Sequence, residues 1–263
     1  MRAGSSACGD RCLQSTVLIA GVDLAAETRG TACALLDFSA PTVKIEVRLG
    51  VPDADIAALA PSVQNLGIDC AFGWPDDFLA FLTRHAAGHP VAASEDQGMA
   101  WRRRLAYRAT DRAVRELTGR WPLSVATDRL GLTALHCAVL LDHVGQTLGS
   151  PVDRAGGGVA VEVYPAATLR LWGFDTKGYK TDATVRGMLL ETLAARAPWV
   201  AFDAGTRELM VHSDDAFDAV VAALAARAHA LGLTHPVPPE CAAQAFREGW
   251  IALPAGRLED LAP

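Results

Sequence analysis

The chain has 263 residues, of which 51% are hydrophobic and 21% are charged, and its formal net charge is −6. This length and composition allow one large buried core, and no apolar run approaches the roughly 20 residues that span a bilayer. The negative charge argues against a protein that coats nucleic acid by charge alone. Residues 1–15 lack the apolar core of a signal peptide, and the cysteines form no pair of C-x-x-C motifs. We therefore predict a flexible N-terminal tail and a cytoplasmic protein with reduced thiols.

The first predicted strand lies within residues 16–25, a short β-branched run whose one charge is Asp23. A second strand at 30–38 follows after a gap of hairpin length, so we expect it to pair antiparallel with the first. Residues 42–49 alternate apolar and charged side chains with a period of two. This alternation predicts a half-exposed third strand toward the edge of the sheet.

A helix predicted within 52–64 leads into an apolar fourth strand at 66–72, whose one carboxylate is Asp69. A strand–helix–strand crossover makes the fourth strand parallel to one already formed, most simply the first strand on its free side. A switch point then lies between the first and fourth strands, where α/β sheets open a crevice at the carboxyl ends. Asp23 and Asp69 are both expected in this crevice.

The remaining chain predicts more helices and one more strand. The helices are expected at 76–87, 100–117, 133–148, 166–172, 182–196 and 214–231, the fifth strand at 159–164, and a short strand or loop at 203–211. The predicted fold class is therefore α/β: one domain over residues 16–255 with a five-stranded mixed sheet in the order 3-2-1-4-5. A helical insertion at about 76–155 separates strands four and five, and residues 256–263 are expected as a C-terminal tail.

The last predicted helix opens with three carboxylates, Asp214, Asp215 and Asp218. The helix dipole favours acidic residues in a first turn, which explains Asp214 and Asp215 in part. Asp218 lies a full turn further in, beside the apolar stripe, and shares a flank with Asp215. A helix packed on the sheet can point this pair into the crevice that holds Asp23 and Asp69.

Carboxylates gathered in one crevice repel each other, and hard cations such as Mg²⁺ or Mn²⁺ relieve that repulsion. Two ions about 3.5 to 4 Å apart clamp a phosphodiester for in-line attack by water. We therefore predict Asp23, Asp69, Asp215 and Asp218 as catalytic metal ligands. Glu162, in the middle of the fifth strand, is either a fifth ligand or a residue bonded to backbone.

Five short motifs resemble a known family. In chain order they are Gly21-Val-Asp23-Leu-Ala, Gly67-Ile-Asp69-Cys-Ala-Phe-Gly-Trp-Pro75, Tyr107-Arg-Ala-Thr-Asp111-Arg, Glu162-Val-Tyr-Pro165 and Asp215-Ala-Phe-Asp218-Ala. Together they are similar to the predicted ribonuclease H-like nuclease family catalogued as domain of unknown function 429. The last motif also resembles the closing motif of RuvC-type resolvases. The resemblance covers about residues 17–254 and implies a ribonuclease H-like fold and a suspected nuclease activity, without a known substrate.

The predicted helix at 100–117 is rich in arginine. The segment from Trp101 to Arg120 contains seven arginines against two acidic residues, Asp111 and Glu116. This is either a solvated charged face or a surface that binds substrate phosphate, a role suited to arginine. We assign substrate binding to Arg104, Arg108 and Asp111, with the alternative that Arg108 pairs with Asp111 or a site carboxylate.

The leading functional hypothesis is metal-dependent hydrolysis of phosphodiester bonds in nucleic acid. One alternative is a nucleic-acid or nucleotide binding scaffold without activity. Another is a phosphotransferase related to actin and sugar kinases, which normally needs a duplicated fold and Gly-rich phosphate loops. The sequence leaves open whether DNA, RNA, a junction or a small nucleotide is the substrate.

Overall fold

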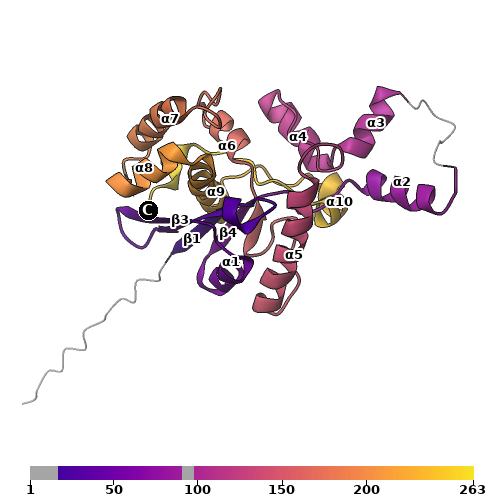
Figure 1. The fold of residues 1–263 in the computed structure, drawn as a ribbon, viewed down its shortest axis with the longest axis horizontal. Helices are drawn as coiled ribbons and strands as arrows, with labels where there is room; N and C mark the ends of the chain where they lie inside the picture. Colours follow the sequence, from indigo (N-terminus) through magenta and orange to yellow (C-terminus); the bar gives the residue numbers. More distant parts are fainter. Residues whose placement is uncertain (1–16, 91–97) are drawn as a thin grey trace, which may run out of the picture.

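A computed structural model describes residues 17–90 and 98–263, and in this part of the chain a single mixed sheet forms the centre of an α/β fold (Figure 1). Its strands are β1 (Leu18–Asp23), β2 (Ala32–Asp37), β3 (Val43–Leu49), β4 (Asn65–Asp69), β5 (Ala160–Glu162) and β6 (Val200–Ala201). They lie in the order β5-β4-β1-β2-β3-β6. Strand β2 is antiparallel to β1 and β3, and the other neighbours are parallel. The prediction of five strands is wrong, because β6 is only two residues long and leaves no pattern in the sequence.

Ten α-helices are assigned within the described residues. They are α1 (Asp53–Leu59), α2 (Asp76–Ala86), α3 (Met99–Ala106), α4 (Ala109–Thr118), α5 (Gly131–Leu148), α6 (Pro165–Leu171), α7 (Ala183–Arg196), α8 (Ala204–His212), α9 (Asp214–Ala230) and α10 (Ala242–Glu248). Helix α8 replaces the short strand or loop expected at 203–211. It begins where the Asp203 side chain accepts a hydrogen bond from the Thr206 backbone N–H, at 2.7 Å. This is an N-cap that stabilises a helix start.

The sheet is covered on both faces. Ile19 packs in a cluster with α9 residues, whereas its neighbour Ala20 packs in a cluster with residues of α1 and α5. Successive side chains of a strand point to opposite faces, so Ile19, Gly21 and Asp23 all face α9. Figure 1 shows α9 on one side of the sheet and α1 and α5 on the other.

Glycine in β1 and β4 lets α9 approach the sheet closely. A Cβ added at Gly21 would lie 2.1 Å from the Ala223 backbone nitrogen, and one added at Gly67 would lie 2.6 Å from the Ala222 carbonyl oxygen. Both distances are far below van der Waals contact, so only glycine fits at either position. The backbone of α9 therefore packs directly on β1 and β4.

The arginine-rich region is two helices and not one. The chain leaves the helical conformation at Tyr107, and Arg108 is the extended N-cap of α4, with φ −68° and ψ 168°. The Asp111 carboxylate accepts a hydrogen bond of 2.9 Å from the Arg108 backbone N–H, which fixes the helix start. The predicted single helix is wrong, and Arg104 and Arg108 do not lie on one helix.

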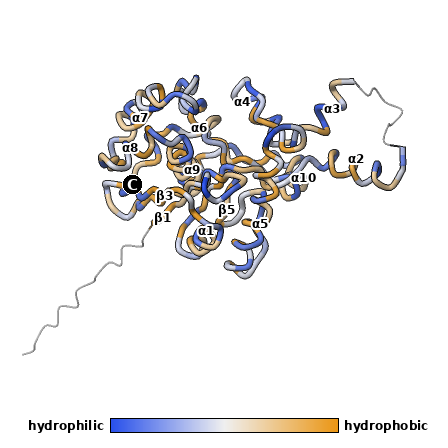
Figure 2. Tube along the Cα trace, in the orientation of Figure 1, coloured by the Kyte–Doolittle hydropathy of each residue, from blue (hydrophilic) through white to orange (hydrophobic). Residues whose placement is uncertain are grey.

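Helices α2 and α3 project from the body of the molecule (Figure 1). Neither helix contains a buried residue, and Figure 2 shows a hydrophilic stretch along α3. We call this pair of helices the arm. In the part of the chain that the structure describes, no helix combines the length and the apolar character needed to cross a membrane.

The sequence predicts an N-terminal tail and a C-terminal tail, and the structure describes only the second. Residues 1–15 lie outside the described residues. Residues 256–263 include the short helix η4 (Leu258–Leu261), and its two leucines are fully buried in the cluster that contains α9. The C-terminal segment is therefore packed against the domain.

Candidate functional site

Asp23 and Asp69 are neighbours at the carboxyl ends of two parallel strands. They are the last residues of β1 and β4, and the register pairs them directly. No strand lies between them, because β1 and β4 are adjacent in the sheet. The sequence-based prediction that both residues lie at one switch point is confirmed in this respect.

Helix α9 brings two further carboxylates to the same face. Ala219 and Ala222 contact the glycines of β1 and β4, and Asp215 and Asp218 precede them by one helical turn. Residues four apart lie on one face of a helix, and Asp23 and Asp69 lie two residues beyond the glycines along the strands. The packing of α9 therefore directs all four carboxylates to one region.

The carboxylates in this region raise each other's pKa. Burial, followed by the charges of Asp69 and Asp218, holds the pKa of Asp23 well above its ordinary value. Burial also raises the pKa of Asp69 to about 7, although the Lys180 ammonium opposes the shift. The pKa values of Asp215 and Asp218 are raised, chiefly by burial. Asp218 is fully buried, whereas the other three are partly accessible. Burial and the neighbouring negative charges both disfavour the ionised form of these carboxyl groups.

Two residues that the sequence analysis missed complete the cluster. The Tyr179 hydroxyl donates hydrogen bonds to both oxygens of Asp218, at 3.0 and 3.3 Å. The Lys180 ammonium forms an ion pair with Asp218 Oδ2. Its pKa is raised by the nearby carboxylates of Asp218, Asp69 and Asp23, against the effect of burial. Both residues lie in an irregular loop between α6 and α7, where no periodic pattern could have marked them.

The loop that carries Lys180 is held firmly. Tyr179 is 2% exposed, and its ring packs against Phe217 with centroids 5.7 Å apart. The buried Arg186 guanidinium donates a hydrogen bond of 2.6 Å to the Tyr179 carbonyl and others to the Met210 and Val211 carbonyls. The backbone at Lys180 is therefore fixed from both α7 and α8.

Glu162 and Arg108 form a separate buried network. The five N–H groups of the Arg108 guanidinium have acceptors in Asp111, Glu162 and the Glu248 carbonyl. Glu162 also accepts a hydrogen bond of 3.0 Å from the Phe72 backbone N–H. The structure thus matches the alternatives for these residues: Arg108 pairs with Asp111, and Glu162 is bonded to backbone and to Arg108.

This network leaves little for ligand binding. Arg108 is 3% exposed and Asp111 is 1% exposed. A guanidinium whose donors are all used by two buried carboxylates and a backbone carbonyl has none left for phosphate, so the substrate-binding role of Arg108 and Asp111 is not supported. Glu162 likewise pairs with Arg108, so its predicted role as a metal ligand is not supported either. Its effect on the main site is electrostatic, because its charge raises the pKa of Asp69.

Arg104 lies on α3 of the arm, away from the ends of β1 and β4 (Figure 1). It is exposed and lines a hollow between α2 and α3, together with Arg84, Phe81 and Trp101. Arg104 is therefore not part of the carboxylate cluster. A role of Arg104 in binding nucleic acid stays a prediction for the arm.

The comparison with protein families identifies one family. A family model described as "Protein of unknown function (DUF429)" matches residues 21–243. The chain belongs to this family. The matched region begins two residues before Asp23 and includes Asp69, Lys180, Asp215 and Asp218. No curated protein and no solved structure gave a significant match to this DUF429 chain.

The donor chemistry and the geometry of the DUF429 site give different answers on whether a metal ion fits. The donor set consists of aspartate carboxylate oxygens, which are ligands that Mg²⁺ and Mn²⁺ prefer. Among the described residues, however, no three His, Cys, Asp or Glu side chains are grouped as a metal site requires. The ammonium of Lys180 already contacts Asp218. The donor types therefore suit a hard cation, whereas the described geometry does not group three of them and places an ammonium on Asp218.

A histidine fixes the chain just beyond Asp23. His136 of α5 places Nδ1 2.6 Å from the Ala25 carbonyl oxygen and Nε2 2.7 Å from Asp53 Oδ1. Burial alone lowers the pKa of His136, but these two acceptors more than compensate, so its pKa is raised. Both ring nitrogens thus lie against acceptors, which favours the protonated form of the ring. His136 thus ties α5 to α1 and to the segment after β1.

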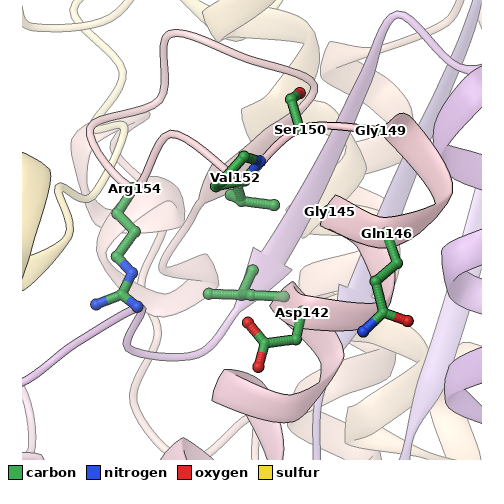
Figure 3. A pocket seen from close by; sticks show the side chains of 9 residues that line it. Asp142, Gly145, Gln146, Gly149, Ser150, Val152 and Arg154 are labelled. Carbon is green, nitrogen blue, oxygen red and sulfur yellow. The ribbon is translucent and has the colours of Figure 1, made fainter.

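A hollow at the C-terminal end of α5 is a second concave region of the DUF429 chain (Figure 3). Its polar lining includes Asp142, Gln146, Ser150 and Arg154. It contains none of the predicted site residues. The carboxylates at the ends of β1 and β4 therefore remain the candidate functional site.

Proposed function

We propose that this protein is a metal-dependent nuclease that hydrolyses phosphodiester bonds of nucleic acid. The observation that carries the proposal is the convergence of Asp23 and Asp69 on adjacent strand ends with Asp215 and Asp218 of α9. A ribonuclease H-like architecture, with relationship to RuvC-type resolvases, is part of the proposal. It is supported by the pairing of β1 with β2 and β4, and by a closing helix that carries two carboxylates over the sheet.

The proposed division of roles follows from burial. All four carboxylates would hold the metal: Asp23, Asp69 and Asp215 as partly accessible ligands, and Asp218 as a buried ligand that the Tyr179 hydroxyl orients. When bound, one or two Mg²⁺ or Mn²⁺ ions would stabilise the charge that develops on the phosphate and activate a water. The pairs Asp23–Asp69 and Asp215–Asp218 come from the sheet and from α9, so the site depends on the packing between them.

The test is a comparison of three single variants: Asp23→Asn, Asp218→Asn and Asp214→Asn. The first two should lose Mn²⁺- or Mg²⁺-dependent cleavage of a panel of single-stranded, double-stranded and branched nucleic acids. Asp214→Asn, at a position that the helix dipole explains, should retain it. In chelator, Asp23→Asn should hold or raise the melting temperature, because it removes repulsion.

Changes in melting temperature opposite to those expected would contradict the proposal. If Asp23→Asn lowers the melting temperature in chelator, and Mn²⁺ does not shift the melting temperature of the unmodified protein, Asp23 is structural. The protein would then be a nucleic-acid binding scaffold without metal-dependent activity.

A further inference from the structure

Lys180 is the cation that the carboxylate cluster already holds. Its ammonium contacts the fully buried Asp218, and its charge also acts on Asp23, Asp69 and Asp215. Yet 45% of its side chain is open to solvent. The ammonium is therefore inside the field of four carboxylates while its flexible stem has room to move.

The position of Lys180 is built into the fold. Tyr179 beside it is buried and bonded to Asp218 through its hydroxyl, and Arg186 holds the Tyr179 carbonyl at 2.6 Å. The same strand and helix positions that would donate oxygens to a divalent ion thus surround a lysine. An ammonium and a divalent ion that contact the same carboxylate repel each other, so each weakens the binding of the other.

We propose that Lys180 is an internal competitor of the divalent metal: its ammonium neutralises the site in the metal-free protein, and metal binding requires it to leave Asp218. This inference rests on the proposed metal-dependent function and adds the residue that controls loading of the site. Lys180 lowers the affinity for the metal and stabilises the metal-free fold.

The direct test measures Mn²⁺ affinity without nucleic acid, by calorimetry and by the metal-induced shift in melting temperature. Lys180→Met should bind Mn²⁺ about tenfold or more tightly than the unmodified protein, because a competing positive charge is gone. Its melting temperature in chelator should fall, because Asp218 loses its partner. Lys180→Arg, which keeps the charge, should remain close to the unmodified protein.

Lys177→Met is the matched control. It removes the same charge from the same loop, and Lys177 is exposed. Its Mn²⁺ affinity should stay within about twofold of the unmodified protein, as expected for a solvent-screened charge. If Lys180→Met and Lys177→Met bind Mn²⁺ equally well, Lys180 is not a competitor and the inference is overturned.

A second measurement uses the unmodified protein, in case Lys180→Met does not fold. Acylation of lysines by an amine-reactive ester is followed by mass spectrometry in chelator and in Mn²⁺. Lys180 should react faster with Mn²⁺ present, because its ammonium has been released to solvent. The rate for Lys177 should be the same in chelator and in Mn²⁺. Unchanged reactivity of Lys180 at saturating Mn²⁺ would overturn the inference.

The two proposals fail in different ways. If Lys180→Met gains Mn²⁺ affinity but no variant cleaves nucleic acid, the nuclease proposal fails and the competitor role stands. If the unmodified protein cleaves with Mn²⁺ but Lys180→Met shows no change in affinity, the competitor role fails and the nuclease proposal stands.

Discussion

A single buried arginine joins three parts of the chain. Arg108 contacts Asp111 at the start of α4, Glu162 at the end of β5 and the carbonyl of Glu248 at the end of α10. Asp111, Glu162 and Glu248 are each 1% exposed. Burying these charges is tolerable only because they pair with each other and satisfy their hydrogen bonds.

We predict that Arg108→Ala destabilises the protein by about 3 to 5 kcal/mol, because it leaves two buried carboxylates without a cation. Urea denaturation measures the change. Arg108→Lys should recover only part of the loss, because one ammonium cannot replace a five-donor fork. The control Arg115→Ala removes an exposed arginine from the same helix and should change stability by no more than about 0.5 kcal/mol. An Arg108→Ala protein as stable as the control would contradict the role of this network.

The sequence could identify Asp23, Asp69 and Asp218 because each interrupts an apolar pattern, and Asp215 because it shares a helix flank with Asp218. It could not separate the two roles open to Arg108. A charged residue at helical spacing is most simply a surface residue, and its burial depends on β5 and α10, which are distant in sequence. Tyr179 and Lys180 were missed for the same reason, because only the fold brings their loop to α9.

At the scale of elements, the contact of α9 with β1 and β4 positions the site. Since α9 carries Asp215 and Asp218 and the strands carry Asp23 and Asp69, any change in this contact moves one pair relative to the other. The contact is made by backbone and small side chains, among them Ala219 and Ala223 against Gly21. Close-packed interiors of this kind do not absorb an added methyl group freely.

We predict that Gly21→Ala destabilises the protein by at least about 1 to 3 kcal/mol, the usual range for overpacking. The added Cβ would lie 2.1 Å from the Ala223 nitrogen and 2.2 Å from the Ala219 oxygen, so α9 must shift. The variant should also show a smaller rise in melting temperature on addition of Mn²⁺ than the unmodified protein, in addition to its lower melting temperature in chelator. Gly131→Ala, which meets no atom within 4 Å, is the control and should be close to neutral.

Most elements with a strong pattern could be predicted, and those set by local capping or tertiary contact could not. The strands containing Asp23 and Asp69 and the helix containing Asp218 carry clear apolar runs. The break between α3 and α4 depends on Arg108 as an N-cap, although Ser, Thr, Asp and Asn are the usual residues there. Strand β6 exists only because residues 200–201 pair with Val43 and Lys44 of β3.

At the scale of the whole molecule, charge is distributed unevenly. The chain carries a net charge of −6, yet three consecutive arginines, Arg102 to Arg104, stand on α3. All three are exposed, and the arm projects from the body that holds the carboxylates (Figure 1). A negatively charged body with an acidic site repels a nucleic-acid backbone, so a proposed nuclease of this shape needs a separate basic surface to retain its substrate.

We predict that the arm is this surface. The triple variant Arg102→Ala, Arg103→Ala, Arg104→Ala should weaken nucleic-acid binding in fluorescence anisotropy and reduce the slope of log Kd against log salt by about 2 to 3, because up to three phosphate contacts are lost. Mn²⁺ affinity should not change, since the arm is separate from the carboxylates.

The matched control for the arm removes three exposed arginines from the body, by Arg29→Ala, Arg48→Ala and Arg257→Ala, so that both triple variants have the same net charge. The side chains of the control residues are 85%, 50% and 76% exposed, respectively. Only the arm variant should lose affinity beyond the small effect of net charge, because contacts with phosphate act locally whereas exposed distant charges are screened by salt. Equal losses in the two triple variants would mean that binding follows net charge alone, and the arm would then be a solvated surface without a specific role.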